Sequence, residues 1–436
     1  MTSMATRSSS TSSSTTTSML GTGSTRTGNP TPVKRTRRDK FLPVTGEWFT
    51  PTELSFSAIR ARPETEWVHF SLSDGSGIVG QGEITDKQLG TSISPIVARL
   101  ANRLRGQKLT SDSDVITLNN LTAEQLETYR PLATAVSGLR CAIADALAQV
   151  AQLPLVDYLR AIHDHDGKAD RKVQLYSNIN RALKPTFDGP NDRSPEGFAE
   201  MAERAMEAGF TTAKCAPFDE CRAPFSNSGL PREAEMGLDR ILAAKAVIGP
   251  DRTLLVDCHS RFDLESALAL EPRLREAGVG WYEEPVNPIE NTDDLRKIRD
   301  KAEMTIAGAE MGYGVALFKK LMEDDVLDVV MPDVKHCGGP VEAYLIGREL
   351  EPRWEGSVSM HCPSGPLSLL ASAHATAAFG ATIPLEHAVY EADWRHEVLE
   401  PFETIEDGFL TLPDGFGLGG RVDPVAIAMR GRAWTE

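Results

Sequence analysis

Six short apolar segments recur at nearly constant spacing in the second half of this chain. Each segment ends in a carboxylate or a histidine, and a stretch with helical periodicity follows it. Successive ends lie 23 to 28 residues apart, which suits one strand, one helix and two short loops. Such repeats predict parallel strands joined by helical crossovers. The residues at the segment ends are Asp257, Glu283, Glu310, Asp333, His361 and Glu386.

Two further strands extend this pattern to a β/α barrel. The segments 172–180 and 210–218 have strand character, so we expect eight strands in all. The C-terminal ends of barrel strands open onto one face, where catalytic residues lie. Polar groups at six consecutive strand ends therefore predict an active site on that face. Helices are expected at 231–247, 264–277, 291–302, 314–323, 340–351 and 366–379.

The flanking segments predict a second, smaller domain. Residues 51–86 alternate polar and apolar side chains as an antiparallel meander does, and 133–151 has the composition and periodicity of a buried helix. We therefore expect an α+β domain at 41–165 and the barrel at 170–390. The C-terminal segment 391–436 is expected to pack back on the N-terminal domain.

Composition limits the partners and the location of the protein. Ser, Thr and Gly dominate residues 1–40, so we expect a disordered tail there, with an organelle transit peptide as the alternative.

The net charge of −16 argues against nucleic acid or an anionic membrane as a partner. No run of apolar residues is long enough to predict a membrane span. The six cysteines form no CxxC pair, which favours free thiols in the cytoplasm.

Three of the strand-end acids predict a metal site. Asp257, Glu283 and Glu310 come from consecutive strands, and carboxylates that converge repel one another unless a cation lies between them. Hard oxygen ligands with open positions suit Mg²⁺. Zinc fits less well, because only His259 offers a nitrogen nearby.

The next two strand ends predict a general base. A buried carboxylate at Asp333 would fix the tautomer of His361 and raise its basicity. Lys214 could be a base or could neutralise carboxylates, and we favour the second role. Lys335 could bind a substrate anion, act as a second base or pair with Asp333, and the sequence does not choose. Glu386 could donate a hydrogen bond to a developing enolate.

This set of residues resembles the enolase superfamily, specifically its mandelate racemase / muconate-lactonizing branch. The resemblance covers about residues 45–436 and includes the helix SGLRCAIADALAQ, which is similar to the one that ends the family's capping domain. It implies an α+β cap, a modified (β/α)7β barrel and a C-terminal tail that completes the cap. It further implies that Asp257, Glu283 and Glu310 hold Mg²⁺, that Asp333 and His361 form a catalytic dyad, and that Glu386 steadies the enolate.

One departure from the family pattern bears on the reaction. The second strand of relatives often carries Lys-x-Lys, whose second lysine is a base on the other face of the substrate, but here the run is Lys214-Cys215-Ala216. Many relatives have Asn where this chain has His259. Family members share a first step, in which a base removes the proton α to a carboxylate and the metal stabilises the enediolate. With one well-defined base, β-elimination of water is favoured over racemisation.

We therefore expect a Mg²⁺-dependent dehydratase of a sugar acid, a small-molecule carboxylate, in a homo-oligomer. His259, Lys335 and Ser364 are polar residues at strand ends that would suit a polyhydroxy substrate. One alternative is a racemase, epimerase or cycloisomerase acting on a related hydroxy or imino acid, such as hydroxyproline or a sugar-acid lactone. A further alternative is a non-catalytic protein that binds a sugar acid.

Overall fold

The computed structural model describes residues 47–86, 90–163, 169–190, 192–225 and 229–436. These residues belong to one compact unit. The disordered tail expected at 1–40 lies outside the described residues.

The N-terminal part is a capping domain built on an antiparallel sheet of order β15-β1-β2-β3. Phe56 and Phe70 are paired across its strands and buried on the apolar face, which packs on helix α4 (Arg130–Val150). Helix and sheet approach closely because β3 carries Gly80, where a Cβ atom would lie 1.9 Å from a carbonyl oxygen of α4. The strands are β1 (Glu53–Arg62), β2 (Thr65–Ser73), β3 (Val79–Glu83) and β15 (Gly431–Trp434), and the other helices are α1 (Ser94–Leu104), α2 (Asp114–Asn119), α3 (Ala123–Thr128) and α5 (Leu155–Ala161).

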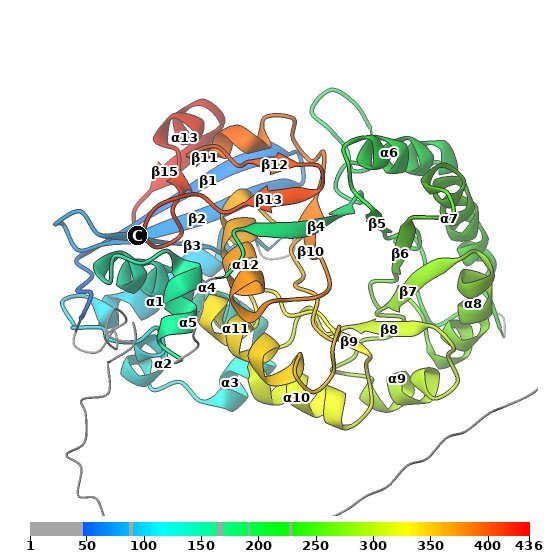
Figure 1. Ribbon diagram of the computed structural model, residues 1–436, viewed down its shortest axis with the longest axis horizontal. Helices are drawn as coiled ribbons and strands as arrows, with labels where there is room; N and C mark the ends of the chain where they lie inside the picture. The colour runs from blue at the N-terminus through cyan, green and yellow to red at the C-terminus, as the bar shows by residue number, and fades with distance from the viewer. Residues whose placement is uncertain (1–46, 87–89, 164–168, 191, 226–228) are drawn as a thin grey trace, which may run out of the picture. The chain divides into compact units, whose positions relative to one another are not determined.

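The second part is a TIM-type barrel, in which the strands form the ring in Figure 1 and the helices lie outside it. Consecutive strands pair in parallel from β4 to β9, and β10 pairs in parallel with β4. The strands are β4 (Lys172–Asn178), β5 (Thr212–Cys215), β6 (Thr253–Asp257), β7 (Val279–Glu283), β8 (Thr305–Gly308), β9 (Val329–Val330) and β10 (Leu385–Ala388). The helices between them are α6 (Pro195–Glu207), α7 (Glu235–Ile248), α8 (Leu264–Glu276), α9 (Thr292–Arg299), α10 (Val315–Glu323), α11 (Gly339–Leu350) and α12 (Pro366–Phe379).

The strand predicted to end at His361 is reduced to one isolated parallel bridge, between Val330 and Val358. Hydrogen bonds still join this segment to both neighbours, since Val330 N donates to Ser357 O and Glu386 N donates to Met360 O. The next donors in these two ladders would be Pro332 and Pro384, which have no amide hydrogen. The prediction of a regular strand was therefore wrong, although the segment occupies its place.

The helix predicted at 231–247 begins later than expected. A 3-10 turn, η3 (Arg232–Ala234), comes first, and α7 starts at Glu235. By contrast, α6 starts directly after Ser194, which accepts a hydrogen bond from Gly197 N as an N-cap.

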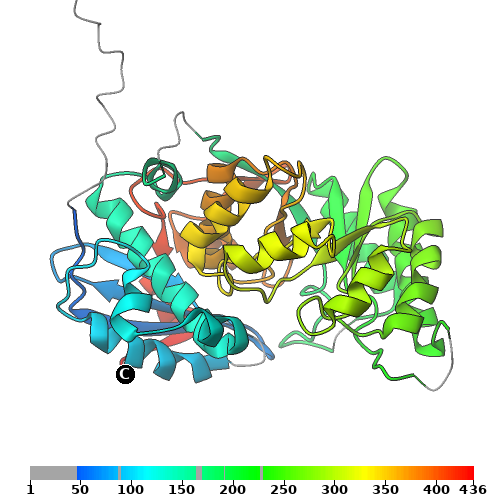
Figure 2. The same cartoon turned by 90° about the horizontal axis from the view of Figure 1, so that it is seen from below.

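The C-terminal segment runs back over both parts of the molecule (Figures 1 and 2). Strand β15 pairs with β1, where Trp434 lies opposite Phe56, and β13 pairs antiparallel with β4. The sequence analysis missed its regular elements, which are short: η4 (Arg395–Val398), β11 (Leu399–Glu400), β12 (Ile405–Glu406), β13 (Phe409–Thr411), β14 (Arg421–Val422) and α13 (Pro424–Arg430).

Among the described helices, only α4 is long and apolar enough to cross a membrane. In this structure 94% of its apolar window is buried inside the protein, as in the core helix of a globular domain.

Candidate active site

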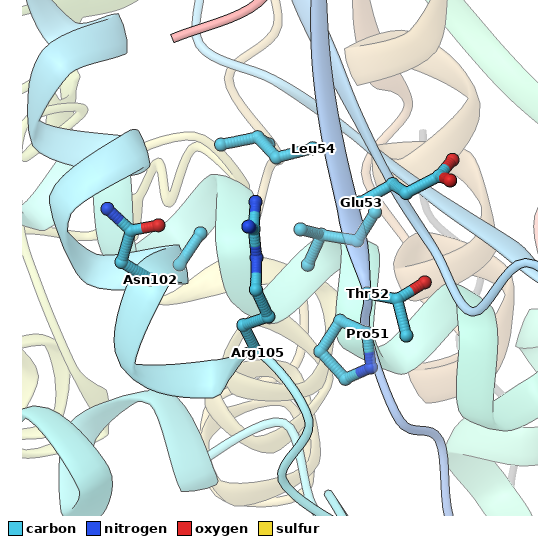
Figure 3. A pocket seen from close by; sticks show the side chains of 8 residues that line it. Pro51, Thr52, Glu53, Leu54, Asn102 and Arg105 are labelled. Atoms are coloured by element: carbon cyan, nitrogen blue, oxygen red, sulfur yellow. The ribbon is translucent and has the colours of Figure 1, made fainter.

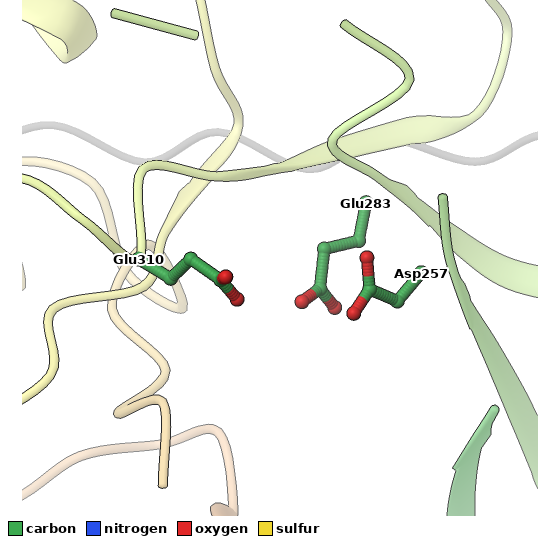
Figure 4. A group of neighbouring side chains, drawn as sticks. All are labelled: Asp257, Glu283 and Glu310. Carbon is green, nitrogen blue, oxygen red and sulfur yellow. The ribbon is translucent and has the colours of Figure 1, made fainter. Parts of the chain in front are cut away.

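Three carboxylates converge at the C-terminal ends of three consecutive barrel strands (Figure 4). Asp257 ends β6, Glu283 ends β7, and Glu310 follows β8 by two residues. One oxygen from each side chain lies within 4.8 Å of the other two, and all three residues are buried. The sequence analysis had grouped these residues from their spacing alone. We call them the carboxylate triad.

The triad fits a divalent metal ion. Burial and the neighbouring carboxylates Asp257 and Glu386 raise the pKa of Glu283 well above its usual value, against the lowering effect of Lys214. The Glu283 Oε2 atom is buried and has no hydrogen-bond partner among the described residues. A buried carboxylate oxygen without a partner is costly, and hard oxygen ligands are what a divalent cation such as Mg²⁺ prefers.

A histidine–aspartate pair lies at the Glu310 end of the triad. His361 Nδ1 is 2.9 Å from Asp333 Oδ2, and His361 Nε2 is 2.8 Å from Glu310 Oε2. Burial lowers the pKa of His361, but the charges of Glu310 and Glu386 outweigh it and raise that pKa well above its usual value. Asp333 thus fixes the orientation of the ring and leaves Nε2 pointing to the triad.

A second histidine–aspartate pair lies at the Asp257 end. His259 Nδ1 is 2.6 Å from Asp219 Oδ1, and His259 Nε2 is 2.9 Å from Asp257 Oδ2. Burial lowers the pKa of His259, while Asp257 and Asp219 raise it well above its usual value. The sequence analysis treated His259 as a substrate contact and missed Asp219, which lies on the loop after β5 with no strand register to mark it.

Glu284 is a further buried carboxylate that the sequence analysis missed. Its Oε1 accepts hydrogen bonds from Ala309 N at 2.9 Å and from Glu310 N at 3.3 Å, while Oε2 accepts from Ser260 Oγ. Burial, with Glu310 and Asp257 nearby, raises the pKa of Glu284 to about 8. It orients the backbone that carries Glu310. The Glu283-Glu284 pair in the sequence was the available signal.

The backbone next to the triad adopts uncommon conformations. His259, Ser260, Glu284 and Ala309 have φ angles of 46°, 56°, 38° and 75°, although none is glycine. Residues held in this left-handed region cost energy and concentrate at functional sites. The turns redirect the chain just after β6, β7 and β8, next to the triad residues.

Lys214 and Glu386 form a buried ion pair on the other side of Glu283. Lys214 Nζ lies 2.8 Å from both Glu283 Oε1 and Glu386 Oε1, and Asn178 Nδ2 donates to Glu386 Oε1 at 2.6 Å. Cys362 N donates to Glu386 Oε2. Glu386 lies within β10 rather than at its end, because that strand continues to Ala388.

The remaining predicted residues differ in their placement. Lys335 is buried, and its Nζ lies 3.0 Å from Asp333 Oδ2, the third of the arrangements that the sequence left open. Ser364 is also buried, but its carbonyl accepts from Arg395 Nη1 and no contact among the described residues joins its hydroxyl to the triad.

A separate small pocket in the cap is lined by side chains without such chemistry (Figure 3). It holds about 10 Å³ of space between β1 and α1, and Arg105 extends across it. It does not add to the site described above.

Comparison with known proteins agrees with this geometry. Residues 44–159 match the mandelate racemase / muconate lactonizing enzyme N-terminal domain, and residues 197–426 match the enolase C-terminal domain-like family. A D-xylonate dehydratase from Haloferax volcanii is 25% identical over 83% of this chain and 84% of its own length. A D-galactarolactone cycloisomerase from Agrobacterium fabrum is 28% identical over 54% of this chain and 60% of its own.

A solved structure resembles the whole fold. The mandelate racemase/muconate lactonizing enzyme-like protein from Rubrobacter xylanophilus has a TM-score of 0.74 and 26% identity, covering 88% of this chain and 98% of its own. Together with the dehydratase relatives, the family match indicates an enzyme of the hydro-lyase type. The chain therefore belongs to the enolase superfamily, in its mandelate racemase / muconate lactonizing enzyme branch.

Proposed function

We propose that the protein is a Mg²⁺-dependent dehydratase that removes water from a sugar acid. The observation that supports this most directly is the pair of histidines at opposite ends of the carboxylate triad. In the elimination of water the α-proton is accepted by a base and the leaving hydroxyl is protonated, and two histidines can divide these two tasks. Relatives named as dehydratases of D-xylonate, D-gluconate and D-galactonate support a sugar acid as the substrate.

The metal ligands in this proposal are Asp257, Glu283 and Glu310. A Mg²⁺ ion held by these residues would supply positive charge that stabilises the negative charge developing when the α-proton leaves. His361 Nε2 lies beside Glu310 at one end of the triad, and His259 Nε2 lies beside Asp257 at the other. Both ring nitrogens therefore border the place where the three ligands would hold the ion.

His361 is the proposed base. Its Nδ1 hydrogen is donated to Asp333, so Nε2 accepts the proton from the substrate α-carbon, and Asp333 stabilises the imidazolium that results. Asp333 is fully buried and accepts a second hydrogen bond from Lys335 N. The ring therefore stays in one orientation through the reaction.

His259 is the proposed acid. Its Nδ1 pairs with Asp219, so Nε2 can donate a proton to the hydroxyl group that leaves the β-carbon. The carbon–oxygen bond breaks as the electron pair from the α-carbon forms the double bond, and water departs. The enol acid that remains tautomerises to a 2-keto-3-deoxy acid. Ala216, directly after β5, stands where relatives often have a second lysine, so His259 is the proposed group opposite His361.

Lys214 and Glu386 stabilise the charge that develops on the substrate. The ammonium group of Lys214 lies between two carboxylates. Burial lowers the pKa of Lys214, but Glu283 and Glu386 outweigh this effect and raise the pKa well above its usual value, so the group stays protonated. It acts electrostatically and not as a base. Ser364 is proposed as a substrate contact once the site is occupied.

We also propose a modified (β/α)7β form for the barrel, with the cap at 41–165, the barrel at 170–390 and the completing segment at 391–436. The protein is proposed to be a cytoplasmic homo-oligomer. Its substrate is proposed to be a small carboxylate, with no nucleic acid or membrane partner.

A cycloisomerase is the second candidate function. The observation that favours it is the 28% identity to a D-galactarolactone cycloisomerase. Opening a lactone by elimination of its ring oxygen from the β-carbon also needs a base at the α-carbon and an acid near the departing oxygen, which the same two histidines would provide.

The test is a substrate panel followed by proton NMR. The protein is incubated with Mg²⁺ and D-xylonate, D-gluconate, D-galactonate, L-arabinonate or D-galactarolactone, with EDTA in a parallel set. A 2-keto-3-deoxy product that EDTA abolishes supports the dehydratase, whereas a product of unchanged composition supports the cycloisomerase. If no acid loses or exchanges its α-proton, the proposal fails for these substrates. Calorimetric titration with Mg²⁺ tests the metal site separately, and Glu283→Gln is expected to weaken binding about 10-fold or more.

A further inference from the structure

A continuous chain of hydrogen bonds runs from the cap to the proposed base. The Oγ1 atom of Thr134, in the cap helix α4, lies 2.9 Å from the Nδ1 atom of His336. His336 Nε2 lies 3.4 Å from Lys335 Nζ, which lies 3.0 Å from Asp333 Oδ2. The same Oδ2 atom is 2.9 Å from His361 Nδ1. All five residues are buried.

The direction of each hydrogen bond in this chain follows from its cap end. Thr134 Oγ1 donates to Arg130 O at 2.9 Å, because a carbonyl can only accept. The hydroxyl oxygen must therefore accept from His336 Nδ1–H. Burial and the charge of Lys335 lower the pKa of His336 to about 4, so the ring is neutral and its Nε2 accepts from Lys335.

Lys335 is consequently a donor on both sides. One ammonium hydrogen goes to His336 and another to Asp333, and the protonated amine has no lone pair with which to act as a base. Burial lowers the pKa of Lys335, but Asp333 raises it above its usual value. Removing one partner of a buried ion pair is costly, because the other is left buried and unpaired.

The segment that carries Lys335 is also fixed to α4 by its backbone. Gly338 N donates to Ser137 Oγ at 2.9 Å, and helix α11, which starts at Gly339, packs against α4. A Cβ atom at Gly339 would lie 3.0 Å from Ser137 O. The loop between Asp333 and α11 thus lies directly on the cap helix.

We propose that Lys335 is a positioning residue that couples the cap helix α4 to the base pair Asp333–His361. His336 and Thr134 hold the ammonium group, and the ammonium group holds the Asp333 oxygen that orients the imidazole. This inference rests on the proposed function of His361 as the base, but the hydrogen-bond chain itself does not depend on any substrate.

The first test reads the histidine tautomers directly. The protein is labelled with ¹⁵N-histidine, and His336→Gln assigns the His336 signals. We expect His336 to be neutral at about pH 7 with its proton on Nδ1, and Thr134→Val to shift both its signals and those of His361. Thr128→Val is the matched control, since Thr128 Oγ1 makes the same bond to a carbonyl four residues earlier, in α3. A His336 proton on Nε2, or a charged ring, would overturn the proposal.

The second test separates positioning from simple structural support. On whichever acid of the panel is turned over, Lys335→Met is expected to lower kcat about 100-fold while KM and the affinity for Mg²⁺ change little. Thr134→Val should lower kcat by a smaller factor in the same direction. A rise in KM with kcat unchanged, or no change at all, would contradict the coupling. If no acid is turned over, the proposed function fails, and the tautomer measurement still decides whether the chain exists.

Discussion

The two histidine–aspartate pairs at the ends of the carboxylate triad are similar in connectivity but differ in support. In each pair Nδ1 contacts an aspartate and Nε2 contacts a triad carboxylate. The His361 side chain is 6% exposed and its Asp333 is fully buried at the end of the barrel ladder. The His259 side chain is 34% exposed, and its Asp219 lies on the loop after β5.

Their surroundings also differ. Asp333 accepts from a backbone amide and from the buried Lys335. Asp219 instead pairs with Lys184 at 2.8 Å and lies 3.6 Å from Arg193, both outside the barrel strands. In the proposed reaction the base always removes the proton from the same α-carbon, so it benefits from a fixed position. The acid must reach the leaving hydroxyl of a particular substrate, and it can lie beside a variable loop.

The largest effect is expected from His361→Asn. Loss of the proposed base should lower the rate of α-proton exchange with solvent and the rate of water loss, both by about 10³-fold or more. The measurement is proton NMR in D₂O with the substrate of the panel. His396→Asn is the control, because that exposed histidine lies outside the site. Retained α-proton exchange in His361→Asn would mean that His361 is not the base.

A smaller effect is expected from Asp219→Asn. The amide cannot orient and stabilise a protonated His259 as the carboxylate does, so the rate of water loss should fall about tenfold. Exchange of the α-proton should be nearly unaffected, because Asp333 and His361 are unchanged. If exchange falls as much as water loss, the two pairs do not have separate roles.

A third histidine serves as a contrast, because it has no carboxylate partner among the described residues. His374 is buried in α12, where Val156 N donates to its Nδ1 and its Nε2 donates to Leu418 O. Burial lowers its pKa to about 4. The unfolded chain binds this proton more readily, so stability is fully present above about pH 6.5 and is lost as the pH falls toward about 4.

Urea unfolding should reveal this loss. Between about pH 8 and about pH 5, His374 should remove about 2 kcal/mol of the free energy of unfolding, and His374→Gln should remove that part of the pH dependence. Exposed His396→Gln is again the control. An unchanged pH slope in His374→Gln would contradict the assignment of a neutral buried ring.

The amino-acid sequence was sufficient for the parts of the site that follow strand periodicity. Asp257, Glu283 and Glu310 recur at strand ends, and parallel strands bring such ends together. Asp219 could not be found this way, because it lies on a loop whose path depends on tertiary contacts with Lys184 and Arg193.

The same limit applies to the weakest strand and to the C-terminal segment. The segment ending at His361 has strand composition, but Pro332 and Pro384 in its neighbours interrupt the ladder. The strands after 390 are only a few residues long. Two of them, β13 and β15, pair with β4 and β1, which are far away in the sequence. Short elements stabilised by distant partners leave little local signal.

The most direct test of separate roles is the behaviour of His259→Gln in D₂O. With the acid removed and the base intact, the α-proton should still exchange for deuterium at a rate close to that of the unaltered protein. Formation of the 2-keto-3-deoxy acid should fall by about 100-fold or more. If exchange and product formation fall together, or if both persist, His259 is not the group that protonates the leaving hydroxyl.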